Sequence, residues 1–279
     1  MKVRLTTITE NSVSRPGLLA EWGLSIFIET EKGNFLLDTG GEELTAAYNA
    51  QRLGKDLSSL DKIIISHGHM DHTGGLVDIL KRVGKPVEII AHPEIWADKY
   101  GKLPNEDMHY TGVPHRLEKL LSLGARFNLT TEPVRVTDDI MTTGEVKMQT
   151  EYEDVDSNLF IKVKGELMPD TLPDDLALII NTGSGLAVVT GCAHRGIINT
   201  LHHAQSITGV DYIHTVIGGT HLLRASEERM VATIEALKSF GLQRLGVSHC
   251  TGALPAARLA QEFGEIFFFN NAGTTLEIE

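Results

Sequence analysis

The chain lacks the features that mark membrane and secreted proteins. No apolar stretch among its 279 residues approaches the roughly eighteen uninterrupted residues of a transmembrane helix. Its first residues enter a strand-like pattern without the apolar core of a signal peptide. Only two cysteines occur, Cys192 and Cys250, and they form no C-x-x-C pair that would staple a small fold. These absences favour a cytoplasmic protein in a reducing compartment.

Positive charge is also scarce. The 25 Lys and Arg residues are outnumbered by 37 Asp and Glu residues, which gives a net charge of −12. This balance argues against a nucleic-acid groove, because binding to phosphates requires clustered Lys and Arg. No Pro/Ser linker, charge run or short-period repeat divides the sequence, and 42% of the residues are hydrophobic. We therefore expect residues 1–279 to form a single domain with a substantial core.

Metal-ligating side chains are concentrated in residues 63–76. An apolar stretch that predicts a buried strand is followed at once by three histidines and an aspartate, which are His67, His69, Asp71 and His72. Imidazole and carboxylate are ligands that zinc and other first-row divalent metals prefer. One metal seldom takes four ligands from so short a stretch, so the pattern predicts two adjacent metals.

Further candidate ligands follow two later predicted strands. Residues 186–190 lead to Cys192 and His194, which point the same way if the chain stays extended. Residues 245–248 lead to His249 and Cys250. A thiolate at Cys192 would bind zinc or iron, whereas a small cysteine packed at a strand end is the alternative. Cys250 likewise either lines the site or packs behind it.

The motif H-x-H-x-D-H followed by Gly74 and Gly75 resembles the signature of the metallo-β-lactamase superfamily. Residues 35–40, 190–197, 218–222 and 249–252 are similar to one branch of it, known as dihydropterin-methyl ribofuranosyl-aminobenzene-phosphate synthase or metal-dependent hydrolase. The similarity covers nearly the whole chain. It implies an α/β fold of the αββα sandwich type, with two mixed sheets flanked by helices.

The resemblance also implies a dinuclear metal site. His67, His69 and His194 would hold one divalent metal, and Asp71, His72 and His249 would hold the other. Zinc is the first expectation, and iron or manganese are the alternatives. Asp38 would orient metal-bound imidazoles from behind, or would instead cap a helix expected over residues 42–53.

The sequence departs from the superfamily pattern in two places. Relatives carry a histidine shortly before a strand near Leu176, where this chain has Pro173, Asp174 and Asp175. This departure makes His194 our candidate to complete the first metal's ligands. Cys192 stands where many relatives have a metal-bridging aspartate.

We predict a metal-dependent hydrolase that acts on an anionic small molecule, bearing phosphate or carboxylate, through a metal-bound hydroxide. Asp71 would help to orient the nucleophile. His221 and Arg195 would place or neutralise the anionic group, since Arg195 precedes a predicted helix at residues 196–207. The sequence leaves open a homo-oligomer.

Two other functions remain open at this stage. One is a synthase-type transferase that condenses an aminobenzoate with a phosphoribosyl donor. The other is an iron-containing redox or sensing protein of the same fold, although flavo-diiron relatives have glutamate where this chain has His69.

Two expectations concern the middle of the chain. Residues 100–133 form the least regular region, which is either a lid or substrate loop, or an ordinary surface insertion. Residues 134–137, 140–143, 159–163, 176–180 and 186–190 are predicted to form successive strands of the second sheet.

Overall fold

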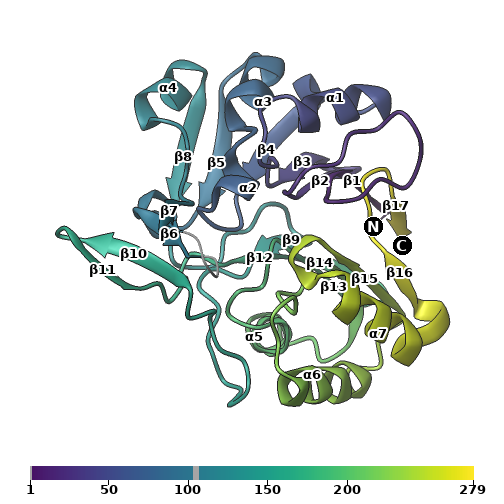
Figure 1. Cartoon of the computed structure of the whole chain (residues 1–279). Coiled ribbons are helices and arrows are strands. Elements are labelled where there is room, and N and C mark those ends of the chain that lie inside the picture. Colours follow the sequence, from purple (N-terminus) through teal and green to yellow (C-terminus); the bar gives the residue numbers. More distant parts are fainter. Residues whose placement is uncertain (1, 103–106) are drawn as a thin grey trace.

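Two stacked sheets with helices on both outer faces form the body of the protein (Figure 1). The computed structural model describes residues 2–102 and 107–279. The first sheet has the order β17-β1-β2-β3-β4-β5-β8. Its strands are β1 (Val3–Thr9), β2 (Ser25–Thr30), β3 (Gly33–Leu37), β4 (Leu60–Ile64), β5 (Val87–Ala91), β8 (Ala125–Leu129) and β17 (Thr275–Ile278). The sheet is mixed, being antiparallel from β17 to β3 and parallel from β3 to β8.

The second sheet has the order β16-β15-β14-β13-β12-β9. Its strands are β9 (Ile140–Thr142), β12 (Ala177–Thr182), β13 (Gly185–Thr190), β14 (Ile213–Gly219), β15 (Arg244–Ser248) and β16 (Phe267–Phe269). The four strands from β13 to β16 run parallel. Their carboxyl ends therefore lie at one edge of the sheet.

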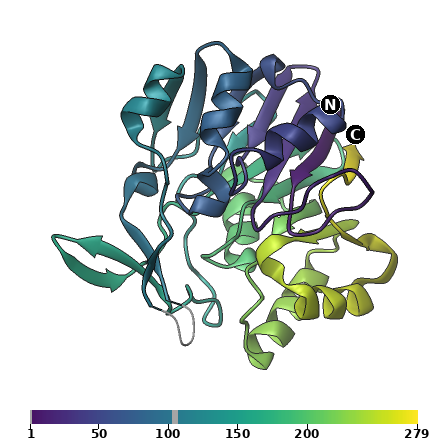
Figure 2. The same cartoon turned by 45° about the horizontal axis from the view of Figure 1, so that its top comes forward.

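Helices cover the outer face of each sheet, as Figure 2 shows from a second direction. The first sheet carries α1 (Thr45–Arg52), α3 (Leu76–Val83) and α4 (Leu117–Ser122), and the short α2 (Met70–Thr73) precedes α3. The second sheet carries α5 (Ile197–Thr208), α6 (Glu227–Ser239) and α7 (Ala253–Phe263). The layers confirm the predicted αββα sandwich. Among the described residues, no helix has the length and apolarity needed to cross a membrane.

Alternation along the strands explains why both faces of each sheet are buried. In β4, Ile63 packs under the helices of the first layer, whereas Ile64 faces the second sheet. Val188 and Val189 of β13 divide in the same way between the outer and inner faces. Successive strand residues point to opposite faces, so these apolar runs fill three layers of core.

Two of the strand predictions are wrong. Residues 134–137 make one isolated bridge, Arg135 with Met141, because the backbone N–H groups of Val136 and Thr137 both bond to the Ile140 carbonyl in a turn. Residues 159–163 do form β10 (Leu159–Val163), but this strand lies outside the second sheet. It pairs with β6 (Lys99–Gly101) and β11 (Glu166–Pro169) in a separate four-stranded sheet with β7 (His109–Tyr110). The β10–β11 hairpin projects from the body (Figure 1).

Candidate metal centre

The segment that follows β4, which we call the metal turn (residues 66–72), brings four predicted ligands together. His69 precedes α2 in an extended conformation, and α2 carries Asp71 and His72. The imidazole ring of His67 lies 4.8 Å from that of His69 and 4.2 Å from that of His72, measured between centroids. His194, which follows β13 in the other sheet, lies 4.7 Å from His67 by the same measure.

The first ligand group consists of His67, His69 and His194, all of them buried. The Nε2 atoms of His67 and His194 are 3.2 Å apart, and the buried Nε2 atom of His69 has no hydrogen-bond partner. Two nitrogens bound at about 2.0–2.1 Å to a tetrahedral zinc ion lie roughly 3.3 Å apart. The spacing and the unpaired nitrogen therefore fit a shared cation.

The second ligand group consists of Asp71, His72 and His249. His249 Nε2 lies 3.1 Å from Asp71 Oδ2, and His72 Nε2 lies 3.9 Å from the same oxygen. Trp22 Nε1 also donates to Asp71 Oδ2 at 3.0 Å. The carboxylate is thus fixed in position beside both imidazoles.

Cys192 lies between the two ligand groups. Its sulfur lies within 4.8 Å of ligand atoms of His67 and His194, and also within 4.8 Å of ligand atoms of His72 and His249. The distance from Cys192 Sγ to His72 Nε2 is 3.1 Å. The sulfur therefore lies close enough to both groups for a thiolate here to be a ligand of either cation.

Burial controls the charge of the first group. It lowers the pKa of His67 and His194 far below the ordinary value and lowers the pKa of His69 to about 3. These imidazoles are therefore neutral at neutral pH, which is the form that binds metals. Burial also opposes protonation of His72, but the carboxylates of Asp38 and Asp71 outweigh it and raise the pKa of His72 to about 9.

Asp38 supports the metal turn from behind. Its Oδ2 atom lies 2.7 Å from His72 Nδ1 and accepts a bond of 2.7 Å from the Ser66 hydroxyl, and that hydroxyl contacts His67 Nδ1 at 2.9 Å. Such carboxylate–imidazole contacts fix the ring that holds a metal. The alternative role, as a helix cap, is wrong: α1 begins at Thr45 and is preceded by Leu44.

The segment that lacks the superfamily histidine supplies a buried carboxylate instead. Asp174 Oδ2 accepts the backbone N–H of Gly68 at 2.7 Å, and its Oδ1 accepts from Lys99 Nζ at 2.8 Å. Lys99, which is only 1% exposed, also donates to Asp170 at 2.9 Å. Asp174 therefore holds the backbone of the metal turn. No sequence pattern indicates this contact, since nothing marks Lys99 as a buried residue.

Arg195 does not occupy the predicted position. Its guanidinium pairs with Glu145 at 2.7 Å, away from the cavity described below. The first free N–H groups of α5, those of Ile198 and Asn199, bond to the Glu153 carboxylate at 2.9 and 2.8 Å. The anion site expected at this helix N-terminus is thus filled by the chain's own Glu153, and we assign Arg195 no role in catalysis.

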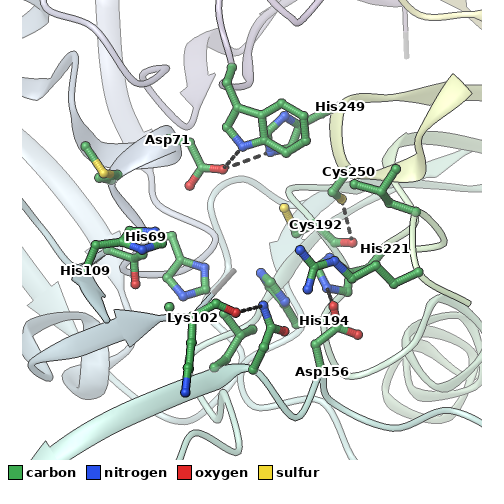
Figure 3. Close-up of a pocket in the computed structure, with 18 residues that line it drawn as sticks. His69, Asp71, Lys102, His109, Asp156, Cys192, His194, His221, His249 and Cys250 are labelled. Carbon is green, nitrogen blue, oxygen red and sulfur yellow. Dashed lines mark hydrogen bonds and ion pairs between the residues drawn. The ribbon is translucent and has the colours of Figure 1, made fainter. Parts of the chain in front are cut away.

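A cavity of about 480 Å³ opens onto the ligand groups (Figure 3). Its lining includes His69, Asp71, Cys192, His194 and His249. His221 forms part of the wall, where its ring lies 4.0 Å from that of His194 between centroids. The wall also includes apolar side chains from Trp22, Met70, Leu159 and Leu223, the cationic residues Lys102 and Arg224, and the anionic residue Asp156. The arrangement suits a small molecule with both apolar and anionic parts.

Residues 100–133 contribute to this cavity through Gly101, Lys102, His109 and Thr111, whereas their later part forms α4 and β8. Residues 103–106 lie outside the described part of the chain. The described residues of 100–133 therefore form part of the cavity wall and, through β8, the edge of the first sheet, rather than a plain surface insertion. His92 has a local structural contact, since its Nδ1 accepts the N–H of Glu94 at 3.1 Å.

Comparison with known proteins agrees with this geometry. The family described as the Metallo-beta-lactamase superfamily matches residues 23–205. A protein of Methanocaldococcus jannaschii named 7,8-dihydropterin-6-methyl-4-(beta-D-ribofuranosyl)-aminobenzene-5'-phosphate synthase is 34% identical over 92% of this chain and 90% of its own length. An uncharacterized protein of the same organism is 30% identical over 87% of this chain and 88% of its own length. A crystal structure described as a metal-dependent hydrolase of the beta-lactamase superfamily superposes with a TM-score of 0.86, at 26% identity and with 99% of both chains covered.

Proposed function

Because the chain belongs to the metallo-beta-lactamase superfamily, we propose that it is a metal-dependent hydrolase that acts on an anionic small molecule at a two-metal site. The observation that carries the proposal is the meeting of two ligand groups around Cys192 beside an open cavity. His67, His69 and His194 would hold one cation, and Asp71, His72 and His249 would hold the other, with Cys192 between them.

When bound, two divalent cations would supply Lewis acidity to a phosphoryl or carbonyl oxygen and would lower the pKa of a water molecule. The protein's own groups would then orient the reactants. Trp22 and His249 hold Asp71 Oδ2 in place, so that this carboxylate can accept a hydrogen bond from the attacking water. Trp22 is therefore a positioning residue that the sequence alone did not single out.

The anionic part of the substrate would lie toward Lys102 and Arg224, which line the cavity and are exposed. Among the described residues, the Asp156 carboxylate in the same wall lies 3.3 Å from His221 Nε2, and no ion pair within 4.0 Å involves Lys102 or Arg224. The two cations would therefore attract a phosphate or carboxylate. His221 would contact the substrate from the wall beside His194. The apolar wall around Leu159 and Leu223 would receive the uncharged part of the molecule.

A second candidate function is a synthase-type transferase. It is favoured by the relative that is 34% identical, because that protein is named as a synthase. Its named product carries a phosphate, so the same cationic wall would serve that substrate. The two candidates differ in their products. Release of pyrophosphate from a phosphoribosyl donor would support the transferase, whereas hydrolysis without it would support the hydrolase.

The test combines elemental analysis of the purified protein with a screen of phosphoesters, lactones and thioesters. The proposal predicts at least about two equivalents of metal and metal-dependent hydrolysis of at least one class. Metal-replete protein that hydrolyses none of them, yet releases pyrophosphate, would replace the first candidate with the second.

A further inference from the structure

We propose that Cys192, His221 and Cys250 form a third cation position, suited to a thiophilic divalent cation such as zinc or ferrous iron. It adjoins the two positions already described and shares Cys192 with them. The inference does not depend on which reaction the protein catalyses.

The topology of the second sheet places these three residues together. Strands β13, β14 and β15 are parallel neighbours that end at Thr190, Gly219 and Ser248. Cys192, His221 and Cys250 each lie two residues beyond the end of one of these strands. Three adjacent strands therefore deliver one ligand-type side chain each to the same edge of the sheet.

The side chains converge as closely as a metal site requires. The two sulfur atoms and one nitrogen of His221 all lie within 4.8 Å of one another. Ligands of a tetrahedral zinc ion with two sulfurs and one nitrogen lie roughly 3.5–3.8 Å apart, so only small side-chain shifts would be needed. All three residues line the cavity, which gives a cation a path from solvent (Figure 3).

The lack of a side chain at Gly219 permits this close approach. A Cβ atom added at Gly219 would lie 2.6 Å from Cys250 Sγ and 2.4 Å from the Gly191 carbonyl oxygen. The glycine thus leaves the space in which the Cys250 sulfur lies next to the loop that carries Cys192.

The imidazole of His221 is placed as a metal ligand would be. Neither of its buried ring nitrogens makes a well-formed hydrogen bond. Its Nε2 atom lies 3.3 Å from Asp156 Oδ2, and an imidazole that binds a metal through one nitrogen commonly directs the other to a carboxylate. The backbone of His221 is also held at φ +50°, a left-handed conformation that non-glycine residues rarely adopt and that is concentrated at functional sites.

Cys250 lacks a strong alternative partner, whereas Cys192 is shared with the two other ligand groups. Cys250 Sγ donates a weak bond of 3.4 Å to the Cys192 carbonyl oxygen, and both cysteines are free and buried. Two thiolates would neutralise a divalent cation, and thiolates select soft cations over hard ones. The third position therefore differs in chemistry from the ligand group of Asp71, His72 and His249.

The test is an anaerobic titration of metal-free protein with Co²⁺, which reports both stoichiometry and thiolate-to-cobalt charge-transfer absorption. The wild type is expected to bind about three equivalents, of which one produces most of the charge-transfer signal. Cys250→Ser and, separately, His221→Ala are expected to lose about one equivalent, and Cys250→Ser also loses the larger part of that signal. His202→Ala, which removes an exposed imidazole on α5, serves as the matched control and is expected to keep all equivalents.

Saturation of the wild type at about two equivalents would overturn the inference, as would an undiminished charge-transfer signal in Cys250→Ser. Circular dichroism establishes whether each variant is folded. If Cys250→Ser does not fold, the stoichiometry of His221→Ala still tests the inference. Loss of metal from the two-metal site is reported separately by His69→Ala. A thiolate signal that survives in His69→Ala and is lost when Cys250→Ser is added to that variant would uphold the third position even if the proposed two-metal site failed.

Discussion

His67 and His194 are 127 positions apart in the sequence, yet their Nε2 atoms lie 3.2 Å apart in the folded chain. One residue follows β4 of the first sheet and the other follows β13 of the second. Two buried imidazoles that face each other in this way must share either a proton or a cation, and the unpaired Nε2 of His69 beside them favours a cation. The ligand group therefore forms only when both sheets are stacked.

Asp38→Asn is expected to weaken zinc binding roughly 10–100-fold, because the amide cannot replace both contacts that the carboxylate makes with Ser66 and His72. Competition with a chromophoric chelator measures the affinity. Asp138→Asn, at a side chain that is 91% exposed, is the control and should leave it unchanged. Equal affinities in the two variants would show that Asp38 does not orient the histidines.

Lys99→Met is expected to destabilise the fold by about 3 kcal/mol, because it leaves Asp170 and Asp174 buried without their cation. Urea unfolding of metal-free protein measures the change. Lys238→Met removes a surface ion pair with Glu262 instead and should change stability little. If Lys99→Met unfolds at the wild-type midpoint, the buried pair is not what holds the metal turn.

Asp175→Asn should remove a pH dependence of stability. Burial raises the pKa of Asp175 to about 7 in the folded protein. The backbone N–H of Arg195, which donates to this carboxylate, lowers the pKa, whereas the charge of nearby Asp174 raises it further. A carboxyl group whose pKa is raised on folding stabilises the fold fully below its unfolded pKa of about 4 and loses that contribution as pH rises to about 7. Unfolding of metal-free protein across this range should therefore show a decline that Asp175→Asn flattens. Identical profiles in the two proteins would contradict the assignment.

Arg224→Ala is expected to raise KM for an anionic substrate roughly tenfold with little change in kcat, since the exposed cation acts on binding rather than on the chemical step. Steady-state kinetics on a substrate identified in the screen, and on its uncharged ester, give the comparison. Lys238→Ala, which is remote from the cavity lining, is the control. A loss of kcat without a change in KM would place Arg224 in the reaction instead.

Local patterns in the sequence were enough to predict much of the fold. The apolar stretch before the metal turn predicted the strand that β4 forms, residues 140–143, 176–180 and 186–190 predicted β9, β12 and β13, and the helix expected over residues 196–207 is α5. These signals depend on neighbours along the chain. The structure also brings the seven candidate metal ligands close together, because each lies in the metal turn or shortly after a strand of the second sheet.

The features that sequence reasoning missed depend on partners distant in the chain. Arg195 lies beside the N-terminus of α5, but its guanidinium pairs with Glu145, 50 positions away. The free N–H groups of that N-terminus bond to Glu153, 45 and 46 positions away. Lys99 is buried only because Asp170 and Asp174 neutralise it. Strand β10 has an ordinary strand pattern, but nothing in that pattern indicates that it pairs with β6 rather than joining the second sheet.

Metal content of His69→Ala, measured beside His202→Ala after loading both with zinc and removing excess, tests the central claim most directly. His69 offers a buried, unpaired nitrogen to the first ligand group, whereas His202 is exposed on α5. We predict that His69→Ala loses about one equivalent of zinc or more together with its activity, and that His202→Ala retains both. Full zinc stoichiometry in His69→Ala would contradict the account.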